Sequence, residues 1–307
     1  MSVSEHGRSE SIRHRLRNIV RERGEDVQFA LQRYAIERFL YRLGISGHRN
    51  RFVLKGATLF ALWGGEVYRP TRDLDFTVYG SSDPTVVLSA LRDICDFSGG
   101  ADGLVFDADS LTAEQIRDGG EYQGLRIRFE ARLGESHIPL QIDIGFGNAI
   151  EPPPQESEYP TFFSDPPPRI RTYPPEAVVS EKLHAVVLLG ERNSRYKDFY
   201  DLCVIGRQFS FAGARLARAV QATFDRRRTP IGAPLPAALN PLFYADVNRA
   251  GQWRAYVTRN VLPGAPEDFA LVGGMVQGFL SPLWDALARS EAFTLQWPRS
   301  GPWGTPE

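Results

Sequence analysis

The chain has 307 residues, of which 42% are hydrophobic and 11% aromatic, so it can bury a sizeable core and form two domains. Its 36 basic and 37 acidic side chains give a net charge of −1, which excludes a disordered or uniformly basic protein. Only three of the cations are lysines, and these are Lys55, Lys182 and Lys197. A genome-wide preference for arginine codons explains most of this bias, so the positions of the three lysines are the informative part.

The cysteines and the apolar segments indicate a cytoplasmic location. Cys95 and Cys203 lack metal-ligand spacing and are typical of a reduced protein. The N-terminus lacks the apolar core of a signal peptide, and no stretch reaches the roughly 18 apolar residues of a membrane span, so we expect no membrane partner. The first 60 residues carry a net charge of +6, which suits a phosphate-rich partner, although the solvated face of an ordinary helix explains it as well.

The first 150 residues alternate between helical and strand patterns. Apolar residues recur at helical spacing early in the chain, with breaks at Gly24 and Gly44. Strict alternation of polar and apolar residues marks the strands, and Gly56 opens the turn from the first strand into a helix. The expected elements are one or two helices over 11–43, a strand over 51–55, a helix over 59–63, a strand over 73–79, a helix over 84–95, and strands over 125–133 and 140–146.

The second half of the chain begins with a proline-rich segment. Nine prolines lie between residues 152 and 175, and proline runs propagate neither a helix nor a central strand. We therefore expect a stiff crossover between two domains there. The patterns beyond it are helical, over 176–189, 194–205, 212–224, 244–261 and 271–292.

The strongest chemical signal is a pair of aspartates that follows a glycine turn. Asp73 and Asp75, at positions i and i+2 of a strand, project from the same face and can hold divalent cations, while Gly56 opens a helix whose free N–H groups suit a polyphosphate. Two such ions can activate an attacking hydroxyl and stabilise a departing pyrophosphate. Asp143, on the polar face of another strand, would bind a metal or take the proton from the attacking hydroxyl, unless it only caps the turn after its strand.

A second group of charged residues follows the prolines. Lys182 lies on a helix that apolar neighbours anchor, and its compact ammonium suits nucleotide phosphates. Lys197 and Asp201 are spaced i, i+4, with Asp198 beside them, and the plain alternative is an exposed ion pair on a helix. His184 is expected at the edge of the core, because no second histidine lies at metal spacing.

Four ordered motifs between positions 55 and 202 carry a family resemblance. They are Gly56-Ala57 with Asp73-Leu74-Asp75, then Asp143, then Glu181-Lys182-Leu183 with Ala185, then Lys197-Asp198 with Tyr200-Asp201-Leu202. In this order they resemble the motifs of the AbiEii-type nucleotidyltransferase toxins. That family includes the mycobacterial MenT toxins and belongs to the DNA polymerase β-like nucleotidyltransferase superfamily.

The resemblance implies both a fold and an activity. The fold is α+β, with a nucleotidyltransferase domain over 1–175, whose mixed β-sheet is flanked by helices, and a helical domain over 176–307 that contributes the third and fourth motifs. The activity is the transfer of a nucleotide from an NTP to the 3′ acceptor end of tRNA with Mg²⁺ or Mn²⁺, which blocks aminoacylation and translation. The resemblance further implies a cognate antitoxin, encoded in the same operon.

The roles of single residues follow by position from the resemblance. The metal-binding residues are Asp73, Asp75 and Asp143, the catalytic set adds Lys182 and Asp198, and the nucleotide-binding residues are Gly56, Ala57, Thr58, Arg72, Lys182 and Lys197. Many superfamily members have Ser or a second Gly in place of Ala57, so one hydroxyl contact to phosphate is missing. Backbone N–H groups and the hydroxyl of Thr58 are expected to take its place. For Arg72 a surface ion pair is an equal alternative.

The same residues are compatible with two other functions. The acceptor could be a small molecule or a protein side chain instead of tRNA, or the chain could be a module that binds NTP or RNA without catalysis. Candidate contacts to a tRNA backbone are Arg226-Arg227-Arg228 and the arginines at 8, 13, 15, 17, 21 and 23.

Overall fold

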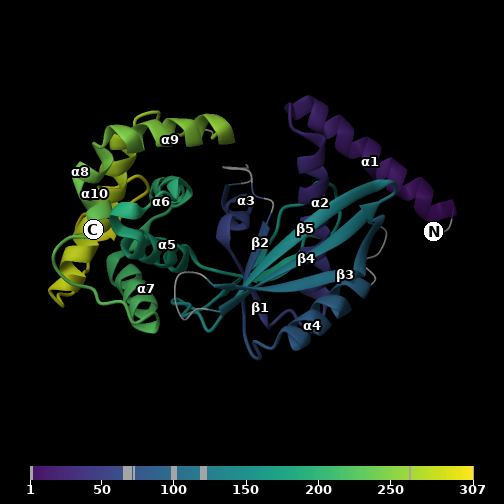
Figure 1. Ribbon diagram of the computed structural model, residues 1–307, viewed down its shortest axis with the longest axis horizontal. Helices are drawn as coiled ribbons and strands as arrows, with labels where there is room; N and C mark the ends of the chain where they lie inside the picture. Colours follow the sequence, from purple (N-terminus) through teal and green to yellow (C-terminus); the bar gives the residue numbers. More distant parts are fainter. Residues whose placement is uncertain are drawn as a thin grey trace. The chain divides into compact units, whose positions relative to one another are not determined.

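The computed structural model of the protein describes residues 3–64, 71, 73–97, 102–117, 123–262 and 264–306 (Figure 1). The chain divides into two compact units. The N-terminal unit comprises Met1–Gly147 and Gln155–Thr172, and the C-terminal unit comprises Asn148–Pro154 and Tyr173–Glu307.

The N-terminal unit is built around a mixed sheet of seven strands, in the order β3-β4-β5-β2-β1-β7-β6. The β2–β5 and β1–β7 pairs are parallel and the other pairs are antiparallel. This confirms the mixed sheet flanked by helices. The elements are α1 (Val3–Arg23), α2 (Val27–Ile45), β1 (Phe52–Lys55), a 3₁₀ turn (Gly56–Thr58), α3 (Leu59–Gly64), β2 (Asp73–Val78), α4 (Pro84–Asp96), β3 (Leu104–Arg117), β4 (Gln123–Leu133), β5 (Ser136–Phe146), β6 (Gln155–Glu158) and β7 (Arg169–Thr172).

One face of this sheet is the core of the N-terminal unit. Alternate residues of β2, among them Leu74 and Phe76, are fully buried, and helices α2 and α4 pack against the sheet at β5, β7 and β3 (Figure 1). The ring of Phe39 on α2 lies 5.8 Å from Phe106 and 5.6 Å from Phe129. Burying each such side chain contributes about 1.5–3 kcal/mol, which fixes the opposite residues of the same strands on the polar face.

The helical pattern over 11–43 divides into two helices at Gly24, as the sequence predicts. Gly24 has a φ of 65°, and Asp26 caps α2 by accepting a hydrogen bond from the backbone N–H of Phe29 at 2.9 Å. The second expected break, at Gly44, falls one residue before the end of α2 at Ile45. A Cβ at Gly44 would lie 2.6 Å from the carbonyl oxygen of Arg169, so this glycine allows α2 to approach β7 closely.

The proline-rich segment contributes two strands to the sheet. β6 and β7 lie within residues 152–175, where the sequence predicts only a crossover. β7 pairs in parallel with β1, and its Ile170 and Thr172 are buried. The prolines at 166–168 and 174–175 flank β7 and do not interrupt it, so each backbone N–H of the strand itself remains available for pairing.

The C-terminal unit is helical, as the sequence predicts. Its helices are α5 (Pro175–Leu189), α6 (Tyr196–Gln208), α7 (Gly213–Arg226), α8 (Pro241–Tyr244), α9 (Val247–Asn260) and α10 (Phe269–Ala288) (Figure 1). The short strands β8 (Phe211–Ala212) and β9 (Gln296–Trp297) pair as a two-stranded antiparallel sheet. The tryptophans of this unit serve packing. The indole N–H groups of the four tryptophans in this unit donate to backbone carbonyls, from Trp253 to Pro266, Trp284 to Gly232, Trp297 to Gly206 and Trp303 to Phe279.

Among the described residues, no helix is both long and apolar enough to cross a lipid bilayer.

Candidate active site

Three aspartates share the polar face of the N-terminal sheet. β2 carries Asp73 and Asp75, and β5 runs parallel to it with Asp143 directly opposite Asp75. Residues paired on adjacent strands point to the same face, and the strands are about 4.8 Å apart. The apolar pair Leu74 and Ile142 points to the other face and is fully buried. The sheet therefore holds three carboxylates together on its solvent side.

The glycine turn lies directly beside Asp75. Gly56 has a φ of 72°, and a Cβ at this position would overlap the Asp75 carboxylate. The hydroxyl of Thr58 donates to the backbone carbonyl of Asp73 at 3.2 Å, so the turn and the start of β2 are tied together. Ala57 and Thr58 are both buried. Only glycine accommodates both the backbone angle and the close approach of the carboxylate.

Asp143 is held by an arginine that our sequence interpretation left out of the site. The guanidinium of Arg126 donates from Nε to Oδ1 at 2.9 Å and from Nη2 to Oδ2 at 2.7 Å, and Gln141 adds a weaker bond to Oδ1 at 3.3 Å. These bonds to Asp143 raise the pKa of Arg126 above its ordinary value. The signal that could have found Arg126 is the tight turn at Gly134, since pairing Leu133 with Ser136 sets Arg126 opposite Asp143.

A row of charged residues of both signs crosses the sheet at the level of Asp75 and Asp143. From β3 to β1 the residues paired in register are Glu114, Arg126, Asp143, Asp75 and Lys55. The two adjacent carboxylates thus have a cation on each side. This arrangement offsets the repulsion between Asp75 and Asp143, which would otherwise disfavour two negative charges on neighbouring strands.

The carboxylates suit a hard divalent cation, and Asp73 and Asp75 carry the clearest ligand pair. Carboxylate oxygens are the ligands that Mg²⁺ prefers. Within the described part of the chain, no three His, Cys, Asp or Glu side chains are already arranged around a common metal position. Both oxygens of Asp143 accept hydrogen bonds from Arg126, so the guanidinium competes with any cation for the negative charge of Asp143.

A cavity of about 420 Å³ adjoins the aspartates on the β5 side of β2. Asp73 is the member of the pair that lines it. The other lining residues come from α2, β3, β4 and β5, and they are Gln28, Gln32, Ser110, Thr112, Arg128, Phe129, Glu130, Pro139, Leu140 and Gln141.

The third and fourth motifs meet in the C-terminal unit. The ammonium of Lys182 on α5 donates to Asp198 Oδ1 at 3.0 Å and to Asp201 Oδ2 at 2.6 Å on α6. Arg195 Nε lies 2.8 Å from the other oxygen of Asp198. The side chains of Asp198 and Asp201 are 4% and 0% exposed, so this is a buried ion cluster. The alternative of an exposed pair between Lys197 and Asp201 is wrong, because Asp201 turns inward to Lys182 while Lys197 is exposed.

His184 is a buried histidine, as the sequence predicts. It is 3% exposed, its Nε2 lies 2.8 Å from the hydroxyl of Thr229, and Arg227 Nη1 lies 3.0 Å from its Nδ1. Because arginine can only donate, Nδ1 is the acceptor and Nε2 carries the proton. Burial, with help from the charge of Arg227, lowers the pKa of His184 to about 4. Arg227 also lies 3.6 Å from Glu181, so it serves this network instead of an exposed basic patch.

Arg72 and the arginines of α1 are further residues that the sequence suggests for phosphate binding. Arg72 lies outside the described residues. On α1, Ile12 and Leu16 are buried while Arg8, Arg15 and Arg17 are exposed, so the helix presents its cations to solvent.

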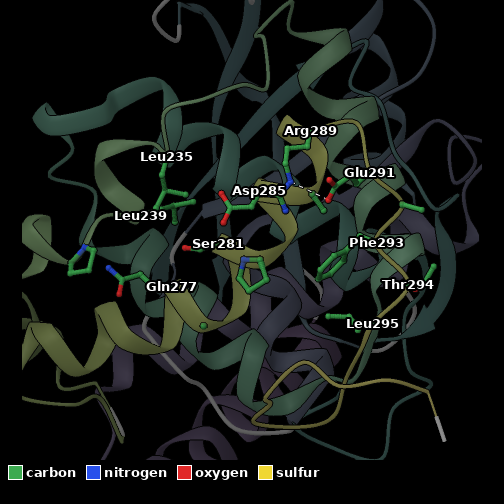
Figure 2. Close-up of a pocket in the computed structure, with 15 residues that line it drawn as sticks. Leu235, Leu239, Gln277, Ser281, Asp285, Arg289, Glu291, Phe293, Thr294 and Leu295 are labelled. Atoms are coloured by element: carbon green, nitrogen blue, oxygen red, sulfur yellow. Dashed lines mark ion pairs between the residues drawn. The ribbon is translucent and has the colours of Figure 1, made fainter.

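A separate hollow of about 790 Å³ lies within the C-terminal unit, and Figure 2 shows the side chains that line it. It is lined by α10 and by the chain that follows this helix, and Arg289 Nε and Glu291 Oε2 form an ion pair there at 3.1 Å (Figure 2). None of its lining residues belongs to the four motifs, so it is not the candidate active site.

A mixed sheet that carries an Asp-x-Asp strand beside a glycine turn, with a third aspartate on the next strand, defines the class of nucleotidyltransferases. The family model of the nucleotidyl transferase AbiEii toxins, of Type IV toxin–antitoxin systems, matches residues 38–288, and the chain belongs to this family. It is therefore a nucleotidyltransferase of the toxin–antitoxin kind.

Two solved structures are similar to this chain. The crystal structure of JHP933 from Helicobacter pylori is 14% identical, with a TM-score of 0.51, over 86% of this chain and 97% of that one, which shows a common fold. A candidate nucleotidyltransferase from H. pylori is also 14% identical, with a TM-score of 0.49, over 87% of this chain and 99% of that one. No curated protein matches the sequence.

Proposed function

We propose that the protein transfers a nucleotide from an NTP to the 3′ acceptor end of tRNA, and so blocks aminoacylation and translation. The observation that supports this most is the placement of Asp75, which lies opposite Asp143 in the sheet and against the Gly56 turn. A carboxylate pair beside a tight backbone turn is what a metal-bound triphosphate requires. A bound Mg²⁺ or Mn²⁺ would supply charge neutralisation of the triphosphate and a more acidic attacking hydroxyl.

The residues of the N-terminal unit have separate parts in this reaction. Asp73 and Asp75 hold the divalent cation, and the backbone at Gly56, Ala57 and Thr58 receives the phosphates. The 3′-hydroxyl attacks the α-phosphorus, the bond from that phosphorus to the bridging oxygen breaks, and pyrophosphate leaves. Asp143 completes the metal site or takes the proton of the hydroxyl. Positioning and charge stabilisation account for most of the rate in such transfers.

The residues of the other two motifs complete the proposed set. Lys182 and Asp198 serve catalysis because they match the third and fourth motifs, and their ion pair holds the lysine side chain in place. Lys197, which is exposed, and Arg72 are proposed as further contacts to the nucleotide.

Two macromolecular partners belong to the proposal. The exposed arginines of α1 would bind the tRNA backbone, since phosphate contacts supply most of the affinity for nucleic acid and make it salt-dependent. The family places the chain in toxin–antitoxin systems, so we propose a cognate antitoxin encoded in the same operon.

The test is a transfer assay with purified protein, Mg²⁺, total tRNA and each α-labelled NTP in turn. Label on tRNA that Asp75→Asn abolishes, and that the exposed control Asp96→Asn retains, supports the proposal. Pyrophosphate release that depends on Asp75 but leaves tRNA unlabelled would instead indicate a small-molecule or protein acceptor. Binding of NTP without any turnover would indicate a binding module.

A further inference from the structure

The cavity beside Asp73 has the composition of a nucleoside site. It opens on the polar face of β3, β4 and β5, and α2 contributes two glutamines to its lining. The side chains of Phe129 and Leu140 belong to the core on the other face of the sheet, and most of the remaining lining residues are polar. Its volume of about 420 Å³ falls within the range of small-molecule sites and suits one nucleoside.

The charge of the cavity argues against a triphosphate as its occupant. Its charged lining residues are Asp73, Glu130 and Arg128, which give a net negative charge. The guanidinium of Arg128 is also paired with Glu114, at 3.0 Å from Nη1 to Oε2. The net negative charge of this lining would repel a polyphosphate, whereas the hydroxyl and amino donors of a neutral nucleoside would find acceptors.

The strand beside the cavity is locally irregular. The pairing of β3 with β4 shifts register between Asp107 and Thr112. Within this bulge the hydroxyl of Ser110 donates to the carbonyl of Asp107 at 2.6 Å and accepts from the backbone N–H of Glu130 at 2.9 Å. Bulges of this kind often reshape a strand next to a functional site. Here the bulge brings Ser110 and Thr112 into the lining of one cavity.

The position of the cavity relative to the glycine turn gives its role. The Gly56 turn follows β1 and touches Asp75, on one side of β2. The cavity lies over β5, β4 and β3, on the other side of β2, and reaches Asp73. In an in-line displacement the attacking group and the leaving group lie on opposite sides of the phosphorus. With the triphosphate at the turn, as proposed above, the cavity lies on the side of β2 from which the attacking hydroxyl would approach.

We propose that this cavity binds the 3′-terminal nucleoside of the acceptor RNA and directs its 3′-hydroxyl toward Asp73. The inference rests on the proposed function and adds the acceptor subsite to it. Recognition of a single unpaired nucleoside by side-chain amides and hydroxyls is the usual way in which proteins read an RNA end. The glutamines at 28, 32 and 141 are then the residues that contact the terminal base or ribose.

The first test fills the cavity with Thr112→Trp. Thr112 is an exposed cavity residue of β3, and Gln115→Trp, also exposed but on the opposite face of the same strand, is the matched control. We expect Thr112→Trp to raise the KM for tRNA by at least about tenfold while NTP affinity, measured at equilibrium with Mg²⁺, stays unchanged. The control should alter neither value. A rise in the dissociation constant of NTP with an unchanged KM for tRNA overturns the inference.

The second test does not depend on activity. An RNA minihelix that ends in a 3′-terminal 4-thiouridine is irradiated on the wild-type protein, and the crosslinked peptide is mapped by mass spectrometry. Crosslinks within 108–115 or 128–141 support the inference, and crosslinks confined to other segments overturn it. If the wild type labels tRNA but both tests fail, only the acceptor subsite is wrong. If the wild type does not label tRNA at all, the proposed function fails and the subsite fails with it.

Discussion

Arg126 and Asp143 form a two-pronged ion pair on the polar face of the N-terminal sheet, with both carboxylate oxygens within 2.9 Å of the guanidinium. Asp143 is a predicted metal ligand, whereas Arg126 is not among the site residues that the sequence predicts. Because the side chains are 32% and 21% exposed, the pair contributes only about 0–1 kcal/mol to stability. Its larger effect is on the charge that Asp143 presents to a cation.

Removing the guanidinium should therefore strengthen metal binding. In Arg126→Gln the Asp143 carboxylate loses its counter-charge, and we expect Mn²⁺ affinity in the absence of nucleotide to rise by roughly three- to tenfold. Titration of Mn²⁺ followed by electron paramagnetic resonance measures this directly. Arg132→Gln, on the same strand, is the control, and Asp143→Asn should lower the affinity. Equal or weaker Mn²⁺ binding by Arg126→Gln would show that Asp143 does not face the metal.

The glycine turn offers a matched pair of substitutions. Gly56→Ala and Gly80→Ala both place a side chain at positive φ, 72° and 97°, which costs about 1–2 kcal/mol. At Gly80 the nearest atom is Arg51 Nε at 4.0 Å, whereas at Gly56 the new Cβ would overlap Asp75. We expect the larger loss of stability in urea for Gly56→Ala, because the Asp75 side chain must also move, and a loss of transfer activity only in that variant. Comparable activity in the two variants would mean that the approach of Asp75 to the turn is irrelevant to the reaction.

The buried cluster around Lys182 has a stability role as well as a proposed catalytic one. Lys182→Met leaves Asp198 and Asp201 buried without their ammonium partner, which should cost about 3–5 kcal/mol, whereas the exposed Lys197→Met should change stability by less than about 0.5 kcal/mol. Lys182→Arg keeps the charge, so it should retain more stability than Lys182→Met yet still impair transfer, because the wide guanidinium changes the geometry. Chemical denaturation and transfer rates separate the two effects. A Lys182→Met protein as stable as the wild type would contradict the ion cluster.

Acidification should destabilise the C-terminal unit through His184. Its pKa is about 4 in the folded protein and 6.5 in the unfolded chain, so between these values the unfolded chain binds a proton that the folded protein does not. Stability is therefore expected to fall as the pH drops from about 6.5 toward 4. In His184→Gln this loss should shrink, which thermal unfolding at pH 7 and pH 5 measures, with the exposed His14→Gln as control. The assignment is wrong if His184→Gln loses as much stability on acidification as the wild type.

Part of this structure could be predicted because strand periodicity is a local property. The alternation of Asp73, Leu74, Asp75 and Phe76 predicts which side chains are buried and which share the polar face, and the same holds around Asp143. β3 was missed because Thr112 to Gln115 are exposed on both faces, so alternation carries no information there. β7 could not be predicted because it has only four residues, and the prolines on both sides are typical of a loop. Its pairing with β1 is non-local.

The site contacts that could not be predicted from the sequence also depend on non-local pairing. Arg126 matters only through the register of the β4–β5 hairpin, which sets it opposite Asp143. Asp201 pairs with Lys182 on α5 instead of with Lys197 on its own helix. Asp201 points into the protein interior and Lys197 points to solvent, so the local i, i+4 contact does not form. Sequence spacing indicates which groups are present, and tertiary packing decides which of them meet.

The most direct test of the central claim is sequencing of tRNA 3′ ends from a bacterium that expresses the protein. We predict nucleotides added to the 3′ acceptor ends in cells with the wild type, and unmodified ends in cells with Asp75→Asn or with the co-expressed antitoxin. Growth arrest by the wild type with tRNA 3′ ends unchanged would contradict the account.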